Sequence, residues 1–263
     1  MKNLMKINES EELIMDKVKA QRSFMKSNFK EDDDFQSDQE LQLPQPALEK
    51  PYDKNSEIIS LPEVTDSIFT KTNLLDILRD RKSNRIYTKE SLTLKELSFL
   101  LWATQGVKEV RGDNYATIRP VPSGGARHPF ETYLAVNRVE GLKNGVYRYL
   151  ALTHELLFLS QDENLEEKLS AMTLGQKFVG RSAVTFIWSA IPYRGEWRYN
   201  VRSHKVMLID AGHLCQNLYI ACEAIGCGTC AVGAYDQEAI DKFLNLDGED
   251  EFVVYMSPVG KAR

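Results

Sequence analysis

The longest regular segment of this sequence is a helix predicted from about Ser203 to Ala224, and it limits what the chain can fold into. Its apolar residues form a wide face, and such a face must be buried against another element of the fold. Gly226 follows it, as glycine often does where a helix ends. The residues that mark the apolar face are Leu208, Ile209, Leu214, Leu218 and Ile220.

A sheet is the predicted partner of this helix, because segments of strand length and composition surround it. FETYLAV, GVYRYL and ELLFL are close together and predict a β-hairpin or meander. AVTFIWSA is apolar throughout and predicts a central strand, whereas GTCAVGAY predicts a strand or an extended loop. The terminal segment EFVVYMSPVG is predicted to be the last strand.

Shorter helices are predicted between these strands. NLLDILRDR is one, LTLKELSFLLWATQG is the second, and an amphipathic stretch from Leu165 to about Leu174 is the third. In the second, Thr93 and Glu96 form a capping box and Gly106 is a C-cap, while Asp236 caps a further helix. Helices and strands alternate without regular βαβ units. The expected class is therefore α+β, with one sheet and helices packed against it.

The first sixty residues differ in composition from the rest. Asn8 and Glu11 form a candidate capping box for a helix from Glu9 to about Lys26. The acidic run 31–34 and a polar, proline-containing stretch to Pro51 bury little apolar surface. We interpret residues 1–60 as an N-terminal helix and arm or linker, and residues 61–263 as the main domain. The arm either lies across a partner subunit or is a solvated tail.

Composition excludes several classes of protein. The 263 residues are 43% hydrophobic and 27% charged, as in globular domains, and the net charge is −5. This negative charge argues against a nucleic-acid-binding protein, which would need a basic face. No apolar run approaches the roughly 18 residues of a membrane span. The first residues contain no apolar core of a signal peptide, so a cytoplasmic location is expected.

Three segments carry residues suited to ligand binding. The basic run 81–85 contains cations and a serine that can bind a phosphate, although such runs are often only solvated surface. The loop 120–126 has paired glycines that let the backbone approach a ligand, or that simply make a tight turn. The small-residue segment 226–233 can lie against a ring system, or lead from a helix cap into a core strand. No Rossmann or P-loop motif is present.

The order and spacing of these segments resemble the FMN-dependent nitroreductase superfamily, in particular its SagB-type dehydrogenase branch. The resemblance covers about Leu61 to the C-terminus. It is carried by LLDILRDRKSNRIY, LTLKELSFLLWATQGV, RPVPSGGARHPFETYLAV, WRYNVRSHKVMLIDAGHLCQNLYIACEAIG and SPVGKAR.

The resemblance implies a role for each segment. Part of the basic run would hold the FMN phosphate and ribityl chain, with a C-terminal basic residue near the phosphate. The glycine loop would reach the flavin from the other subunit, and the backbone of residues 230–233, the end of the small-residue segment, would lie against the isoalloxazine ring. The implied FMN-binding residues are Arg81, Lys82, Ser83, Arg85, Pro122, Ser123, Gly124, Gly125, Ala126, Cys230, Ala231, Val232, Gly233 and Lys261, with Arg263 as a further basic candidate.

The family fold is a mixed α+β sandwich, a sheet between layers of helices, in an intertwined homodimer with two FMN sites at its interface. Its activity is hydride transfer between NAD(P)H or an organic substrate and an acceptor, through bound flavin. The substrate would be a small molecule or a peptide. No protein nucleophile is needed, and the sequence contains no persuasive Ser/His/Asp or Cys/His set.

Two departures bear on the activity. Branch members that oxidise thiazolines and oxazolines in peptides have a catalytic Lys-Tyr pair, where this chain has Arg198 and Tyr199. Tyr199 can take part in proton transfer, but arginine stays protonated and cannot act as a base. Val232 stands where nitroreductases often have glutamate. The alternatives are therefore an azoline dehydrogenase of a biosynthetic complex, or a flavin-binding sensor or scaffold without turnover.

Two further features have competing interpretations. Cys227 and Cys230 form a C-x-x-C motif, but the spacing to Cys215 and Cys222 matches no zinc pattern, so buried core thiols are favoured over a metal or redox role. His213 lies on the long helix, and a structural role in holding that helix to the flavin loop is favoured over catalysis.

Overall fold

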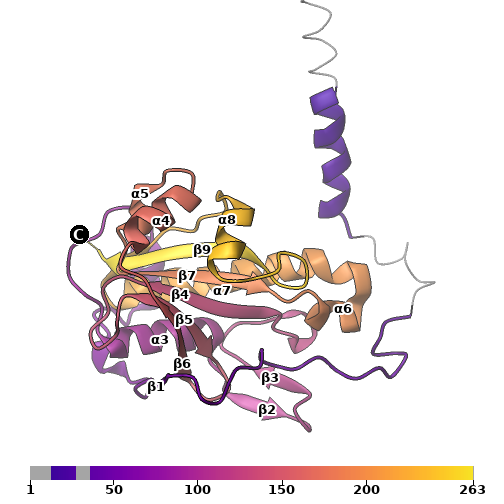
Figure 1. The fold of residues 1–263 in the computed structure, drawn as a ribbon, viewed down its shortest axis with the longest axis horizontal. Coiled ribbons are helices and arrows are strands. Elements are labelled where there is room, and N and C mark those ends of the chain that lie inside the picture. Colours follow the sequence, from indigo (N-terminus) through magenta and orange to yellow (C-terminus); the bar gives the residue numbers. More distant parts are fainter. Residues whose placement is uncertain (1–12, 28–35, 263) are drawn as a thin grey trace, which may run out of the picture.

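The structure is a computed structural model that describes residues 13–27 and 36–262, and its core is a seven-stranded sheet. The strand order is β1-β6-β5-β4-β7-β9-β8, and each of these neighbouring pairs is antiparallel. A separate hairpin, β2–β3, lies beside the sheet (Figure 1). The strands are β1 (Ile58–Ser60), β2 (Glu109–Arg111), β3 (Ala116–Ile118), β4 (Phe130–Val136), β5 (Gly145–Leu150), β6 (Glu155–Gln161), β7 (Val184–Ala190), β8 (Cys227–Thr229) and β9 (Phe252–Lys261).

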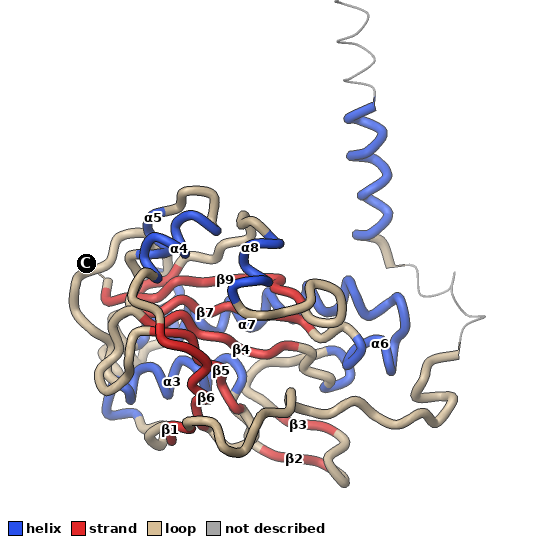
Figure 2. The backbone as a smooth tube through the Cα atoms, viewed as in Figure 1, coloured by secondary structure: helices blue, strands red, loops and turns tan. Residues whose placement is uncertain are grey.

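Helices cover both faces of the sheet (Figure 2). Side chains of a strand alternate between the two faces, and β4 shows this clearly. Leu134 belongs to the core that contains α3 and α7, whereas Tyr133 belongs to the core that contains α4, α5 and α8. The helices are α2 (Leu74–Asp80), α3 (Leu94–Gln105), α4 (Leu165–Met172), α5 (Lys177–Gly180), α6 (Tyr193–Tyr199), α7 (Ser203–Ala224) and α8 (Gln237–Phe243). The predicted α+β class is confirmed.

Short 3-10 turns complete the described elements, and one of them covers part of the predicted N-terminal helix. Residues 13–21 are helical, and the 3-10 turn η1 follows. The candidate capping box of Asn8 and Glu11, the acidic run 31–34 and Arg263 lie outside the described residues. The turns are η1 (Arg22–Met25), η2 (Asp66–Ile68), η3 (Gly124–Ala126) and η4 (Asn200–Arg202).

Elements with strong local signals form where the sequence predicts them. In α3 the Thr93 hydroxyl accepts a hydrogen bond from the Glu96 N–H (3.3 Å), and the Glu96 carboxylate accepts one from the Thr93 N–H (2.9 Å). These reciprocal bonds satisfy N–H groups that the first helical turn leaves without partners. Asp236 caps α8 by accepting from the Ala239 N–H at 3.0 Å. The long helix, α7, has the predicted bounds.

The structure differs from the sequence-based expectations in two respects. First, β1, the β2–β3 hairpin and α6 were not predicted, because each is too short to show a clear periodicity. Second, the apolar face assigned to α7 is only partly buried. Leu214 and Leu218 are 1% and 0% exposed, but Leu208 and Ile209 are 50% and 51% exposed. Within the described residues, the first half of α7 thus presents apolar side chains that its own chain does not cover.

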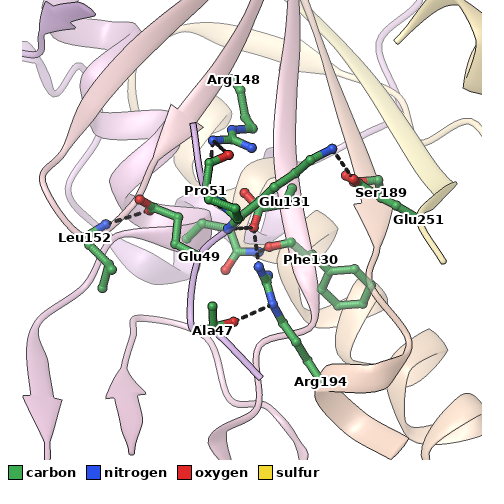
Figure 3. A network of polar contacts seen from close by, with 12 residues as sticks. Ala47, Glu49, Pro51, Phe130, Glu131, Arg148, Leu152, Ser189, Arg194 and Glu251 are labelled. Atoms are coloured by element: carbon green, nitrogen blue, oxygen red, sulfur yellow. Dashed lines mark hydrogen bonds and ion pairs between the residues drawn. The ribbon is translucent and has the colours of Figure 1, made fainter. Parts of the chain in front are cut away.

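A network of buried charges ties the chain segment 47–51 to the sheet (Figure 3). Glu131 on β4 accepts hydrogen bonds from Arg194 on α6 (2.6 Å) and from the N–H of Lys50 (2.8 Å). The Lys50 ammonium pairs with Glu251, which also accepts from the Ser189 hydroxyl at 2.7 Å. We call these five residues the buried clasp. Its charges meet opposite charges at short distance, as buried charges must if they are not to destabilise the fold.

The segment before the clasp runs along α6 and is bonded to it repeatedly. The Trp197 indole donates to the carbonyl of Leu43 (3.0 Å), and the Tyr193 hydroxyl donates to Asp38 (2.8 Å). The position of α6 therefore depends on residues 38–50 as well as on the sheet. In the described part of the chain, no helix combines the length and apolarity needed to cross a membrane.

Candidate functional site

The basic run after α2 lies directly on β8. Ser83 forms a parallel bridge with Thr229, and the N–H of Asn84 donates to the Thr229 carbonyl at 2.8 Å. Gly228 permits this approach, because a Cβ atom there would lie 2.5 Å from the side-chain nitrogen Nδ2 of Asn84. The contact brings Arg81, Lys82, Ser83 and Arg85 close to the segment that follows β8.

Tyr219 on α7 links the basic run to that segment. Its hydroxyl is 3.0 Å from the Ser83 hydroxyl and accepts a hydrogen bond from the Ala231 N–H at 2.8 Å. The guanidinium of Arg81 lies over the Tyr219 ring, 5.3 Å from its centre. Lys261 pairs with Cys227 in the β8–β9 register, so it joins the same region. We call Arg81, Lys82, Ser83, Arg85 and Lys261 the basic cluster.

The charges of the basic cluster suit a phosphate. Lys261 forms an ion pair with Glu96, whereas Arg81 and Arg85 face the rings of Tyr219 and Phe178. In the described residues, no carboxylate lies within ion-pair distance of either arginine. Two guanidinium forks, an ammonium and a hydroxyl are the donors that a phosphate monoester requires.

The segment from Cys230 to Gly233 borders the basic cluster. Val232 is buried, and its N–H donates to the carbonyl of Met256 at 2.8 Å. The Ala231 N–H is engaged by Tyr219, so neither of these two groups is available to a ligand. Gly233 is exposed, and a Cβ atom there would meet nothing within 4 Å. The open surface at Gly233 is where a flat ring can approach this backbone.

The glycine loop does not join the basic cluster in this chain. It packs on the first half of α7, where the N–H of Gly124 donates to Asp210 at 2.9 Å. The loop is closed by Ser123, whose hydroxyl accepts from the His128 N–H at 3.0 Å. Gly125 and Ala126 have φ angles of 59° and 55°, both in the left-handed region, which glycine adopts readily and alanine rarely does.

Arg198 and Tyr199 lie against this loop. A Cβ atom on Gly125 would be 2.6 Å from the Tyr199 hydroxyl and 2.8 Å from Cδ of Arg198. The Arg198 guanidinium donates to the hydroxyl of Tyr115 at 2.8 Å and lies 5.4 Å from the centre of the Tyr199 ring. We call residues 122–126 with Arg198 and Tyr199 the loop group.

The predicted residues therefore form two separate groups on α7. Asp210, which holds the loop group, and Tyr219, which holds the basic cluster, are two and a half turns apart, about 13 Å along the helix axis. One chain brings Arg81, Ser83, Ala231 and Lys261 together, but it does not bring the glycine loop to them.

Asp210, Tyr219 and Tyr115 were missed by the sequence analysis. Burial raises the pKa of Asp210, although the Ser123 hydroxyl and the Gly124 N–H oppose that rise. It is Asp210 that joins helix to loop, since His213 approaches Asp210 only to 3.7 Å. Each of the three is defined by a contact with a distant segment, so no local signal could have identified it.

The four cysteines are free and buried. Burial raises the pKa of Cys215 to about 11 and that of Cys227 to about 12, so these two remain thiols at neutral pH. Among the described residues, no three His, Cys, Asp or Glu side chains are grouped as a metal site would need.

Comparison with known proteins identifies this arrangement. The model of the family described as "Nitroreductase family" matches residues 78–261. The "Putative nitroreductase MJ1384" of Methanocaldococcus jannaschii is 32% identical over 203 residues, which cover 77% of this chain and 96% of that protein. The Trifolitoxin-processing protein TfxB of Rhizobium leguminosarum bv. trifolii is 31% identical over 136 residues, 49% of this chain and 36% of its own length.

A solved structure supports the same assignment. The crystal structure of a "putative nitroreductase" from Ralstonia eutropha superposes with a TM-score of 0.66 at 27% sequence identity. The match covers 84% of this chain and 95% of that one, so the likeness extends over nearly the whole described fold.

Proposed function

Because this chain belongs to the nitroreductase family, we propose that it is an FMN-dependent oxidoreductase of the SagB-type branch, with residues 61–263 as the catalytic domain. The observation that carries the proposal is the basic cluster. It places two guanidiniums that pair with no carboxylate of the described residues, an ammonium and a serine hydroxyl near an open glycine backbone, in a protein of net charge −5.

The residues of the basic cluster fit FMN. Arg81, Arg85 and Lys82 supply charge for its phosphate, Ser83 supplies a neutral hydrogen bond, and Lys261 adds an ammonium from β9. Burial is the largest single influence and lowers the pKa of the Lys261 ammonium, but the hydrogen bond to Glu96 together with the nearby acidic groups of Cys227, Glu96 and Glu90 raises it overall. The charge is thus present at neutral pH, where a phosphate is ionised. Bound FMN would supply two-electron redox chemistry, while the protein supplies binding, orientation and electrostatics.

The separation of the two groups on α7 supports a homodimer. If the glycine loop serves a flavin, it serves one held by a second copy of the chain, because its own basic cluster lies too far along the helix. The exposed Leu208 and Ile209 lie next to Asp210 on that helix. A second copy of the chain would bury this apolar surface, and buried apolar area drives most protein association.

Arg198 and Tyr199 would then face the partner's flavin together with the glycine loop. Tyr199 has a phenol that can donate or accept a proton from substrate. Arg198 keeps its proton under all physiological conditions, so its role is electrostatic. We propose NAD(P)H as the electron donor.

An azoline dehydrogenase is the second candidate. It is favoured by the similarity to a protein whose name describes the processing of trifolitoxin, a similarity that spans about a third of that protein. Arg198 in place of a lysine counts against it, because an arginine cannot take a proton from the azoline ring.

The test is to purify the chain, release any cofactor by heat and identify it by chromatography, then add NADH or NADPH anaerobically. We expect FMN, one per chain, and loss of the visible absorbance of oxidised flavin with at least one nucleotide. A protein without flavin contradicts the proposal. Flavin that only dithionite reduces supports a substrate-fed dehydrogenase or a flavin-binding scaffold instead.

A further inference from the structure

Within the described residues, two arginines of the loop region have no acidic partner. Arg127 and Arg198 lie on either side of the Gly125 backbone, and each bonds only to neutral groups of the described residues. Arg194, by contrast, is neutralised by Glu131 at 2.6 Å. The buried Arg119 and Arg148 also bond only to neutral groups of the described residues, but those groups lie outside the glycine loop. An acidic protein that leaves two neighbouring guanidiniums uncompensated holds a local excess of positive charge.

Arg127 is buried, with 5% of its surface exposed. It donates to the carbonyls of Tyr115 (2.7 Å) and Gly125 (3.1 Å), and it lies between the rings of Tyr115 and Trp197 at 4.8 and 5.4 Å. Burial is the main cause that lowers the pKa of Arg127, and the nearby charge of Arg198 lowers it further. Its contacts satisfy the N–H groups but do not neutralise the charge.

Arg198 is half-buried and held by one hydroxyl. The Tyr115 phenol oxygen accepts from Arg198 at 2.8 Å and from the Gln39 side chain at 2.9 Å. Tyr115 is itself fixed by the stacking of Arg127 on its ring. The direction of the Arg198 guanidinium is therefore set by a phenol and by the segment that contains Gln39.

We propose that Arg198, positioned by Tyr115 and reinforced by the charge of Arg127, recognises an anionic group on the molecule that reacts at this site. The inference rests on the proposed function, which places the loop group beside a flavin. A guanidinium fork binds a carboxylate or phosphate through two parallel hydrogen bonds, and partial burial strengthens that attraction. The anion is a carboxylate of the organic substrate or a phosphate of the nicotinamide nucleotide.

The test compares benzoate with benzamide, which have the same ring but differ in charge. Each is titrated into the oxidised holoenzyme and followed by the flavin spectrum and by calorimetry. We expect the wild type to bind benzoate more tightly. Arg198→Gln should weaken benzoate binding by about tenfold or more, since a hydrogen bond to a charged group contributes about 1.5–3 kcal/mol. Benzamide binding should change less than twofold. Arg181→Gln, which removes an exposed arginine paired with Glu166, is the matched control.

Tyr115→Phe tests the positioning role. It keeps the ring that stacks on Arg127 and removes only the hydroxyl. We expect a benzoate affinity roughly three- to tenfold weaker, with FMN content and melting temperature unchanged, because one neutral acceptor contributes about 1 kcal/mol. Tyr147→Phe, whose hydroxyl donates to the Lys143 carbonyl, is the control and should bind benzoate as the wild type does.

The nucleotide is the second arm of the test. If Arg198→Gln raises KM for NADH or NADPH and leaves benzoate affinity unchanged, the anion site is supported and its ligand is the phosphate. Equal binding of benzoate and benzamide by the wild type, with no effect on the nucleotides, overturns the inference. Loss of FMN from Arg198→Gln also overturns it, because the charge would then serve the cofactor. A wild-type protein without FMN would instead contradict the proposed function.

Discussion

Arg194 and Arg198 are one turn apart on α6, yet they occupy opposite electrostatic environments. Arg194 is buried against Glu131 at 2.6 Å and also donates to the carbonyl of Ala47. Arg198 meets only a phenol and the face of a ring among the described residues. The charge of Arg194 is neutralised within the fold, whereas the charge of Arg198 remains available to a ligand. The charge state of an arginine is constant, so its partner decides whether it stabilises the fold or binds a ligand.

The same contrast separates the buried clasp from the basic cluster. In the clasp, Arg194 pairs with Glu131 inside the protein, and the half-buried Lys50 pairs with the buried Glu251 (Figure 3). In the basic cluster, Arg81 and Arg85 face aromatic rings. Removing a clasp charge should therefore alter stability, and removing a cluster charge should alter ligand affinity. Two predictions test that division, and two more concern the loop region.

The largest effect is expected for Glu131→Gln. Arg194 would remain buried without a compensating charge, which costs about 3 kcal/mol or more of unfolding free energy. Urea denaturation measures it. Glu166→Gln is the control, because the Arg181–Glu166 pair is 63% and 60% exposed and contributes at most about 1 kcal/mol. An equal loss of unfolding free energy in both variants would contradict a stabilising role for the buried clasp.

Arg81→Gln should weaken FMN binding and leave the unfolding free energy almost unchanged. The loss of one charged hydrogen bond to phosphate corresponds to about 1.5–3 kcal/mol, or roughly ten- to a hundredfold weaker FMN binding. The unfolding free energy of the apoprotein should stay within about 0.5 kcal/mol. Quenching of FMN fluorescence gives the affinity. Arg79→Gln, which removes an arginine of α2 that is paired with Asp76, should bind FMN normally.

His128 predicts a pH dependence of stability in the loop region. Burial, followed by the charge of Arg119, lowers its pKa from 6.5 to about 3. The unfolded chain takes up this proton near pH 6.5 and the folded chain does not, so stability falls as the pH drops below about 6.5. The slope for one such group is about 1.4 kcal/mol per pH unit.

Replacement of this residue should flatten that slope. His128→Asn is suitable because residue 128 has a φ of 44°, which asparagine tolerates. Urea denaturation between pH 7 and pH 4 compares variant and wild type. Parallel curves would show that His128 is protonated in the folded protein, in spite of the neighbouring Arg119 and Arg127.

Gly125→Ala is expected to cost about 1–2 kcal/mol of unfolding free energy from the positive φ alone. Its new Cβ atom would also displace Arg198 and Tyr199, which lie 2.8 and 2.6 Å away. Turnover with NAD(P)H and an artificial acceptor should fall more than stability does. Gly141→Ala shares the positive φ but meets nothing within 4 Å, so it should lose stability without losing activity.

Much of the fold was predictable because its signals are local. The Thr93–Glu96 capping box sets the start of α3, and the strand β5 follows from six consecutive residues. The residues of the basic run and the glycine loop were likewise identifiable, since cations and glycines are visible in any sequence. Their assembly was not, because Ser83 meets Tyr219 across 136 positions. The predicted roles of these residues stay predictions until the cofactor is identified.

The sequence by itself determined the elements and the class of the fold, because hydrogen bonding and apolar periodicity act within a few residues. Only the tertiary structure decided which charges were neutralised. Glu131 and Arg194 are 63 positions apart and meet because β4 and α6 pack together with the segment that contains Lys50. One turn further along α6, the same packing places Arg198 beside Tyr115 rather than beside an acid. Whether an arginine lies beside an acid depends on which distant side chain packs against it, and the local sequence does not specify that partner.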